Sequence, residues 1–354
     1  MKHKSKIALL SVKSRSKIVN ENYPDGNPAA RQATSPEEVN MSEEKTLQVL
    51  LAVDGSPHSA AAVAMMAGIE WPARTSVRVL AVVPERWLLT GLNPQAQQVV
   101  DDTLEKMRWV ELAAAERLAT QAAERLKEHG LAAKAEIYEG RPSEVILQRA
   151  ALEGMSAELI VIGARGLSAP EEFQLGSTAY KVAQYAECSV LVIRPLEREQ
   201  PLSVILATDG SPEAQRAAEF FCGFSLPQWA EITVVSVAES TSGLPVGEHE
   251  SVVNPLTSPR EAFSMPDVVR HALLDEAETR AAEAIKLLQD CGAQVQSTIR
   301  LGHPSGEILA IAREQDADLI AIGARGRTRA ALFLLGGVAQ KVVKYAPCSV
   351  LVVR

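Results

Sequence analysis

The chain contains one long internal repeat. Four segments of its first half recur in the same order in its second half. They are VLLAVDGSPHSA (49–60) and VILATDGSPEAQ (204–215), EGRPSEVILQRA (139–150) and LGHPSGEILAIA (301–312), AELIVIGARG (157–166) and ADLIAIGARG (317–326), and YAECSVLVIR (185–194) and YAPCSVLVVR (345–354). A period near 160 residues indicates a duplicated domain, because solenoid repeats are much shorter. The 354 residues leave room for two such domains.

The domain limits follow from composition. Residues 1–45 lack apolar periodicity and are rich in polar and charged residues, so we expect a disordered tail. We expect domain 1 over 46–197 and domain 2 over 198–354, with the boundary in the polar, proline-bracketed stretch 195–202. Met41 stands just before the first apolar run, and we hypothesise that it is the true start; N-terminal sequencing of the native protein tests this.

Each half has the pattern of alternating strands and helices. In the first half, continuous apolar runs typical of strands buried on both faces occur at 48–53, 77–83, 133–138, 158–162 and 189–193. Long amphipathic helices are expected at 99–129 and 267–291, each followed or ended by a glycine. Shorter helices begin at Ser-Pro pairs that suit an N-cap and the first helical position. The alternation predicts an α/β fold of two tandem doubly wound parallel sheets.

Composition excludes several classes of function. The net charge of −8 argues against a general nucleic-acid or anionic-membrane surface, and no apolar run approaches the length of a membrane span. The basic N-terminus has too short an apolar stretch for a signal peptide. The four cysteines form no CxxC pair, which predicts reduced thiols and a cytoplasmic location.

Two segments of the first half carry groups that suit a ligand. Asp54-Gly55-Ser56 follows the first expected strand, and VIGARGLSAPEEFQLGST (161–178) follows the fourth. In a doubly wound sheet, ligands bind beyond the carboxyl ends of the strands, where the strand order reverses. Glycines let backbone N–H groups approach an anion, and a helix that begins at Gly176-Ser177 directs its free N–H groups into the loop.

These features favour a phosphorylated ligand. Ser177 and Thr178 add hydroxyl donors, Arg165 could neutralise phosphate charge, and Asp54 suits the hydroxyls of a ribose or a divalent cation. The alternative is purely structural: glycines after a strand can form a tight turn, and Asp-Gly-Ser can be an Asx-turn with a helix cap. The combination of acid, spaced glycines and hydroxyls in one expected crevice favours the ligand site.

These motifs resemble those of the universal stress proteins. Gly163, Gly166, Gly176 and Ser177 match the family's nucleotide-binding pattern G-x2-G-x9-G-[ST], and the Asp-Gly-Ser turn, the G-x-P at Gly140 and the closing CSVLVIR also match. The resemblance covers nearly all of residues 46–354. It implies a five-stranded sheet in the order 3-2-1-4-5 in each half.

The resemblance also implies binding of ATP, with or without Mg²⁺. The phosphates would lie at the spaced glycines and Ser177, and the ribose beside Asp54. Ala52 and Val82, at the ends of the first two strands, would approach the adenine. The family pairs through its last strands, which implies an internal pseudo-dimer of the two halves, and whole chains could form a homodimer or larger homo-oligomer.

The second half departs from this pattern. Asp209 keeps the acid, and Gly323, Gly326 and Gly336 keep the spacing, but Gly337 replaces the Ser or Thr. The loss of one hydrogen bond to a charged group weakens binding roughly tenfold to a hundredfold. We therefore expect domain 1 to bind ATP more tightly than domain 2.

Three classes of function remain open. The chain could be a nucleotide-binding regulatory protein of stress physiology with at most slow ATP hydrolysis, an interaction module that works without nucleotide, or an enzyme acting on adenylated substrates. The last lacks a signature motif. His58 and His303 fall near the expected loop mouths and are interpreted as surface residues, and Cys188 and Cys348 as inert core thiols.

Overall fold

The computed structural model describes residues 47–85, 94–167, 175–195, 202–223, 230–239, 266–327 and 335–354. The elements of the first half are β1 (Gln48–Val53), α1 (Pro57–Gly68), β2 (Ser76–Val83), α2 (Pro94–Glu128), β3 (Ala132–Glu139), α3 (Pro142–Ala150), β4 (Leu159–Gly163), α4 (Ser177–Tyr185) and β5 (Ser189–Ile193). Those of the second half are β6 (Leu202–Thr208), α5 (Pro212–Cys222), β7 (Ala230–Glu239), α6 (Asp267–Asp290), β8 (Val295–Gly302), α7 (Pro304–Glu314), β9 (Leu319–Gly323), α8 (Gly337–Tyr345) and β10 (Ser349–Val353).

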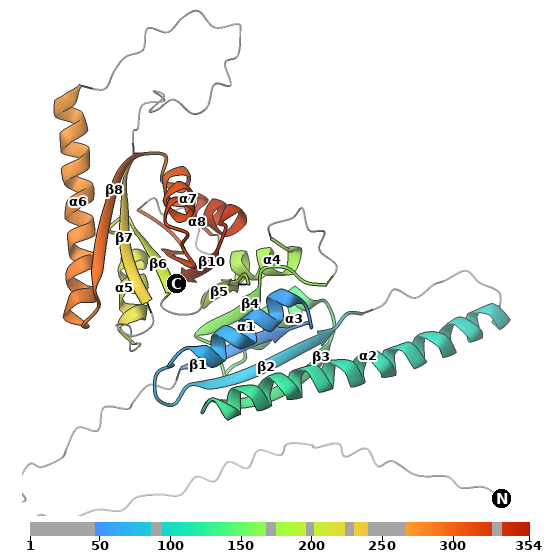
Figure 1. Cartoon of the computed structure of the whole chain (residues 1–354). Helices are drawn as coiled ribbons and strands as arrows, with labels where there is room; N and C mark the ends of the chain where they lie inside the picture. Colours follow the sequence, from blue (N-terminus) through green and yellow to red (C-terminus); the bar gives the residue numbers. More distant parts are fainter. Residues whose placement is uncertain are drawn as a thin grey trace, which may run out of the picture. The chain divides into compact units, whose positions relative to one another are not determined.

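The ten strands of the described residues belong to one sheet. Its order is β3-β2-β1-β4-β5-β10-β9-β6-β7-β8, so each half has the predicted order 3-2-1-4-5. Within each half every pair of neighbouring strands is parallel, as the doubly wound prediction requires. The halves meet at β5 and β10, which pair in antiparallel fashion with Leu191 opposite Leu351 (Figure 1).

Side chains of the central strands point alternately to two buried layers. On β1, Val49, Leu51 and Val53 face the layer formed with α1, α2, α5 and α6, whereas Leu50 and Ala52 face the layer formed with α3, α4, α7 and α8. Burial on both faces explains why these strands read as unbroken apolar runs. Both layers continue from one half into the other across β5 and β10.

The predicted helix boundaries are confirmed where local chemistry sets them. The hydroxyl of Ser56 caps α1 by accepting from the N–H of Ser59, and Ser211 caps α5 in the same way, each followed by a proline in the first turn. Gly130 and Gly292 lie just after the long helices with φ of 82° and 85°, the left-handed conformation that glycine adopts readily. The predicted tail, residues 1–45, and most of the connection at 239–266 lie outside the described residues.

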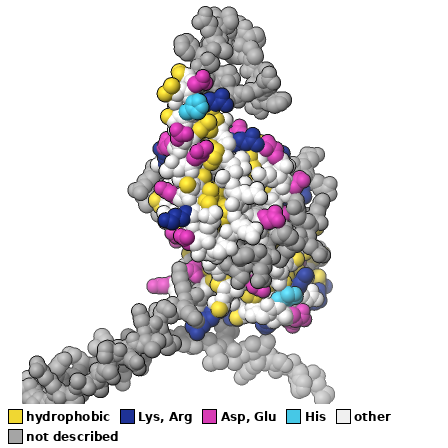
Figure 2. Space-filling view, turned by 60° about the vertical axis from the view of Figure 1, so that its left-hand side comes forward, with side chains coloured by type: hydrophobic (Ala, Val, Ile, Leu, Met, Phe, Trp, Pro, Cys, Tyr) yellow, Lys and Arg dark blue, Asp and Glu magenta, His cyan; other side chains and the backbone are white. Residues whose placement is uncertain are grey.

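The surface carries charges of both signs. Figure 2 shows one face, on the side of α6, where Lys and Arg side chains alternate with Asp and Glu around a line of hydrophobic side chains. At the start of α6, Val268 is 81% exposed. Among the described residues, every helix is too short or too polar to cross a membrane.

Two arginines, the buried Arg194 and the half-buried Arg354, connect the two halves. Arg194, which follows β5, donates from Nη1 to the carbonyl oxygen of Cys348 at 2.7 Å and from Nη2 to that of Val343 at 3.1 Å. Arg354, which follows β10, reciprocates with bonds to the carbonyls of Cys188 at 3.2 Å and Ala183 at 2.7 Å. Each cation therefore bonds one carbonyl in the last turn of the other half's last helix, where positive charge is favoured, and one carbonyl in the segment between that helix and the last strand.

We predict that Arg194→Ala lowers the free energy of unfolding by about 3 kcal/mol. Burial lowers the pKa of Arg194 to about 10, so the side chain is still charged at neutral pH. Its removal leaves two buried carbonyls without their charged donor, each bond being worth roughly 1.5–3 kcal/mol. Urea unfolding measures the change, and Arg141→Ala, which removes an exposed ion pair with Glu144, is the control. Equal stability of the two variants would contradict a stabilising role for the contacts of Arg194 with the second half.

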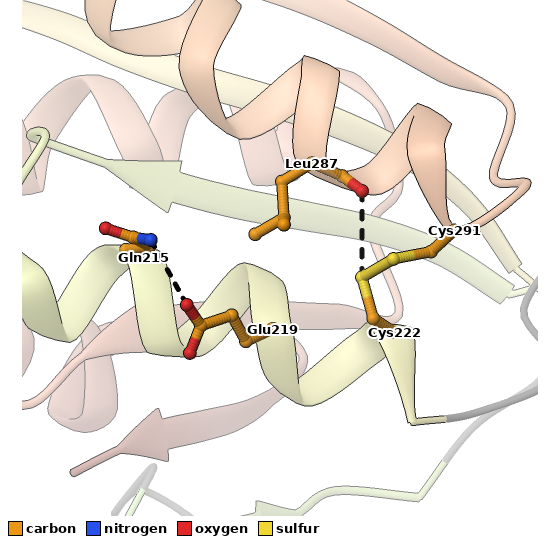
Figure 3. Close-up of a disulfide and its surroundings, with 5 residues drawn as sticks. All are labelled: Gln215, Glu219, Cys222, Leu287 and Cys291. Carbon is orange, nitrogen blue, oxygen red and sulfur yellow. Dashed lines mark hydrogen bonds between the residues drawn. A yellow bond between two sulfur atoms is a disulfide. The ribbon is translucent and has the colours of Figure 1, made fainter.

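The structure corrects the prediction that all four cysteines are reduced thiols. Cys222, the last residue of α5, and Cys291, just after α6, form a disulfide (Figure 3). The Sγ of Cys222 also lies 3.8 Å from the carbonyl oxygen of Leu287. The two cysteines are 69 residues apart and meet because α5 and α6 pack side by side. The cysteines therefore give no support to the predicted location of the protein in a reducing compartment.

The other two cysteines behave as predicted. Cys188 and Cys348 are free, and burial raises the pKa of each thiol to about 11. They are therefore protonated and poorly nucleophilic at neutral pH.

We predict that reducing the Cys222–Cys291 bridge lowers the free energy of unfolding by about 2–4 kcal/mol, because the bridge restricts a long loop of the unfolded chain. Urea unfolding with and without reductant measures this. The double variant Cys222→Ser with Cys291→Ser should unfold at the reduced midpoint and should not respond to reductant. If the intact mass of protein purified without reductant corresponds to four free thiols, the assignment of the disulfide is wrong.

Candidate functional site

The first half brings its two candidate segments together where the strand order reverses. β1 lies between β2 and β4, and Ala52 pairs with Ile162, so both strands end at the same edge of the sheet. The turn that starts at Asp54 and the glycine loop that starts at Gly163 therefore face each other, as predicted. The middle of that loop, residues 168–174, lies outside the described residues.

Asp54 is held in a tight turn with one carboxylate oxygen against the glycine loop. Its Oδ1 accepts from the N–H of Ser56 at 3.0 Å, and Gly55 has a φ of 80°. Its Oδ2 occupies the space that a side chain at Gly166 would need, since a Cβ there would lie 2.6 Å away. The glycine at 166 therefore allows the carboxylate to approach the loop backbone.

Ser56 stabilises the turn and does not line the cavity described below. It is 1% exposed, and its Oγ accepts from the N–H of Ser59 at 3.1 Å and donates to the carbonyl of Arg165 at 3.0 Å. Both hydrogen-bonding roles of its hydroxyl are thus used inside the protein, and it ties the two candidate segments to each other.

Gly163 has a packing reason to be glycine. A Cβ at this position would lie 2.8 Å from the backbone of His58 and Ser59, so the start of α1 rests directly on the end of β4. Contacts below 3.0 Å force a backbone shift, and overpacking of this kind typically costs about 1–3 kcal/mol. The residue also borders the cavity.

The start of α4 presents backbone N–H groups that have no partner within the helix. The N–H of Gly176 is occupied, because it donates to the carbonyl of Ala164 at 2.7 Å. Tyr180 is the first residue whose N–H bonds within the helix, to Gly176 at 3.0 Å. The N–H groups of Ser177, Thr178 and Ala179 precede it and have no acceptor in the helix. The available donors therefore begin at Ser177, one residue after Gly176.

These groups surround a cavity of about 1140 Å³, large enough for a nucleotide. Ten of the residues selected from the sequence line it, namely Ala52, Asp54, Gly55, Val82, Gly163, Arg165, Gly166, Gly176, Ser177 and Thr178. The lining combines polar groups, at Asp54, Arg165 and the start of α4, with apolar side chains such as Val82, Leu118 and Ile146. The predicted residues of the first half other than Ser56 thus converge on one site.

Sequence reasoning missed the wall that α2 contributes. Glu111, Ala114, Ala115 and Leu118 line the cavity from this helix. Their spacing of three and four residues is that of one helical face, so the periodicity of the predicted helix contained a usable signal. Lys344, from α8 in the second half, also lines the cavity, and nothing in the local sequence indicated it.

The prediction that His58 is a surface residue is wrong: its side chain is buried and contacts Arg165, which lines the cavity. The Nε of Arg165 donates to the Nε2 of His58 at 3.2 Å, which requires that nitrogen to be unprotonated. Burial, followed by the charges of Arg165 and Arg194, lowers the pKa of His58. The imidazole is therefore a neutral acceptor that orients a cation. His303, in contrast, is exposed at the start of α7 and contacts Ser305 at 3.1 Å.

The second half repeats the geometry of the turn and loop. Asp209 Oδ1 accepts from Ser211 at 3.0 Å, and its Oδ2 lies against Gly326 as Asp54 lies against Gly166. Gly323 packs on the start of α5, and Gly336 donates to Ala324 at 2.8 Å. The second half therefore retains the residues that shape the turn and the loop in the first half.

The second half differs because charged side chains lie beside its turn and loop. Arg280 of α6 lies over Gly210 where Leu118 of α2 lies over Gly55. Glu276 pairs with Arg280 at 2.5 Å and with Arg327, next to the loop, at 3.3 Å. In the first half α2 presents Glu111, Ala114, Ala115 and Leu118 to the cavity. Ion pairs therefore link α6 to the loop in the second half, where α2 presents mostly apolar side chains in the first.

Gly337 has no steric reason to be glycine. A Cβ at this position would meet nothing within 4 Å, in contrast to Gly323 and Gly336. A serine would fit there, so the fold does not enforce the loss of the hydroxyl.

Comparisons with known proteins agree on one family. The sequence matches the model of the Universal stress protein family over residues 46–194 and 251–354. A universal stress protein of Mycolicibacterium smegmatis is 26% identical over 327 residues, which cover 86% of this chain and 96% of the relative. One of Thermus aquaticus is 38% identical over 153 residues, 43% of this chain and 98% of the relative.

Solved structures agree with this at the level of the fold. The crystal structure of a universal stress protein from Archaeoglobus fulgidus superimposes with a TM-score of 0.52 at 21% identity, covering 86% of this chain and 95% of that one. The chain therefore belongs to the universal stress protein family and carries two copies of the family domain in tandem.

Proposed function

We propose that the chain is a nucleotide-binding regulatory protein of the stress response, and that domain 1 (46–197) binds ATP. The observation that carries the proposal is the cavity at the strand-order reversal, where free helix N–H groups, a hydroxyl, a carboxylate and an apolar wall converge. Occupancy of this cavity would be the signal that a partner protein reads.

The polar groups at the start of α4 fit a polyphosphate. The free N–H groups at the start of α4, together with the helix dipole, attract anions. Ser177 adds a hydroxyl donor, and Arg165, oriented by His58, adds positive charge. The phosphates would therefore bind the N–H groups of Ser177 to Ala179, because that of Gly176 is already engaged.

The remainder of the cavity fits a nucleoside. Asp54 presents a carboxylate to accept from ribose hydroxyls, and Ala52, Val82 and Leu118 provide apolar surface for adenine. Mg²⁺ commonly binds one or two carboxylates plus substrate phosphates. Asp54 could supply such a carboxylate; within the described ranges there is no group of three metal-binding side chains, so phosphate oxygens and water would complete the coordination.

We propose that domain 2 (198–354) serves mainly as a structural partner. Glu276 forms ion pairs with Arg280 and Arg327 beside its turn and loop, and Gly337 lacks the hydroxyl. The antiparallel β5–β10 pair and the reciprocal arginines support an internal pseudo-dimer. For this half alone, these features favour the alternative function of an interaction module that works without nucleotide.

We predict that Ser177→Gly, which gives domain 1 the residue found in domain 2, weakens ATP binding by the full chain roughly tenfold or more. The loss of a hydrogen bond to a charged group accounts for the change. Isothermal titration of the intact chain with ATP measures affinity and stoichiometry, and nucleotide bound to freshly purified protein is identified by mass spectrometry.

Gly337→Ser is the matched control, because it adds a hydroxyl at the equivalent position without a clash. The tighter site should be unchanged in this variant. If the wild-type chain binds no adenine nucleotide, or if Ser177→Gly leaves the affinity unaltered while Gly337→Ser raises it, the assignment of the site to domain 1 is wrong.

A further inference from the structure

Among the residues that the structure describes, the cavity of the first half is lined by one residue from the second half. Lys344 lies in the last turn of α8, and it borders the same cavity as Ser177, Thr178 and Tyr180 at the start of α4. Its place there follows from how the two halves join.

The antiparallel strand pair sets α4 and α8 against each other. Each helix runs back over the strand that follows it, and β5 and β10 are antiparallel, so α4 and α8 are antiparallel too. They cross where the Nε2 of Gln340 donates to the Oη of Tyr180 at 2.5 Å. Lys344 is one turn beyond Gln340 on the same helical face, which brings it beside the first turn of α4.

The environment of Lys344 leaves its charge available. The residue is exposed, and its Nζ lies 5.0 Å from the ring centroid of Tyr345, an aromatic contact that water and anions can displace. Among the described residues it has no ion-pair partner. A lysine side chain has a long flexible stem, so the ammonium can turn toward the N-terminal end of α4.

The duplication makes this contact asymmetric. With the repeat offset of 160 residues that aligns Tyr185 with Tyr345, Lys344 corresponds to Gln184. The first-half mouth therefore receives a cation from α8, whereas the second-half mouth would receive a neutral amide from α4. The half that keeps the hydroxyl at position 177 also receives the positive charge.

We propose that Lys344 of domain 2 completes the phosphate-binding site of domain 1, by pairing with the terminal phosphates of a nucleotide bound at the start of α4. This inference rests on the proposed function. It makes the second half a contributor to the chemistry of the first site as well as its structural partner.

The test compares the full chain with Lys344→Gln, which installs the residue of the other half. We expect the affinity for ATP to fall about fivefold to tenfold, as for loss of one charge-assisted contact, while adenosine binding is unchanged. Lys344→Arg should retain ATP affinity. Lys341→Gln removes a charge from the same helix at a position outside the cavity and should leave affinity unaltered. Thermal melting verifies that each variant is folded.

A second measurement follows Lys344 directly in the wild-type chain. ATP should protect Lys344 from acetylation by acetic anhydride, read by peptide mass spectrometry, and adenosine should not. If the wild type binds ATP but Lys344→Gln binds it equally well, or Lys341→Gln weakens binding as much, the inference fails and the proposed function stands. Failure of the wild type to bind ATP overturns both.

Discussion

The antiparallel pairing of β5 with β10 is the contact on which the rest of the architecture depends. It turns two five-stranded sheets into one, and both hydrophobic layers continue across it. It also gives each half's final arginine access to carbonyls at the end of the other half's last helix. Because strand direction fixes helix direction, the same pairing brings the end of α8 to the start of α4.

Comparison of the halves separates what the fold requires from what a ligand requires. Gly163 and Gly323 both lie against a helix backbone, and any side chain there would push the helix away. Such positions are retained in both copies. At the cavity walls the copies differ: Leu118 corresponds spatially to Arg280, and Ser177 to Gly337. The differences fall on groups that would touch a ligand and leave the packing intact.

The sequence predicted most of the fold because its signals are local. Continuous apolar runs located the strands, and Ser-Pro pairs and glycines marked the helix ends within a few residues. The convergence of Asp54 with the glycine loop could also be predicted, since both follow strands that meet at one edge. The roles of individual groups could not: Ser56 is fully used in holding the turn, and the N–H of Gly176 is bonded to Ala164.

Features that depend on distant segments escaped prediction. Cys222 and Cys291 are far apart in the chain and become neighbours only when α5 and α6 pack, so counting cysteines and looking for CxxC suggested free thiols. Lys344 reaches the first cavity only through the sheet junction, and no pattern near residue 344 reports that. In both cases the relevant distance is set by tertiary structure.

The disulfide has a topological consequence for domain 2. It encloses β7, the whole of α6 and the whole of 240–265, the stretch in which the two halves differ most in length and composition. A protease that cut the backbone anywhere inside this closed ring would leave both fragments covalently joined. The disulfide therefore keeps the strands on either side covalently connected when the stretch between them is lengthened or cut.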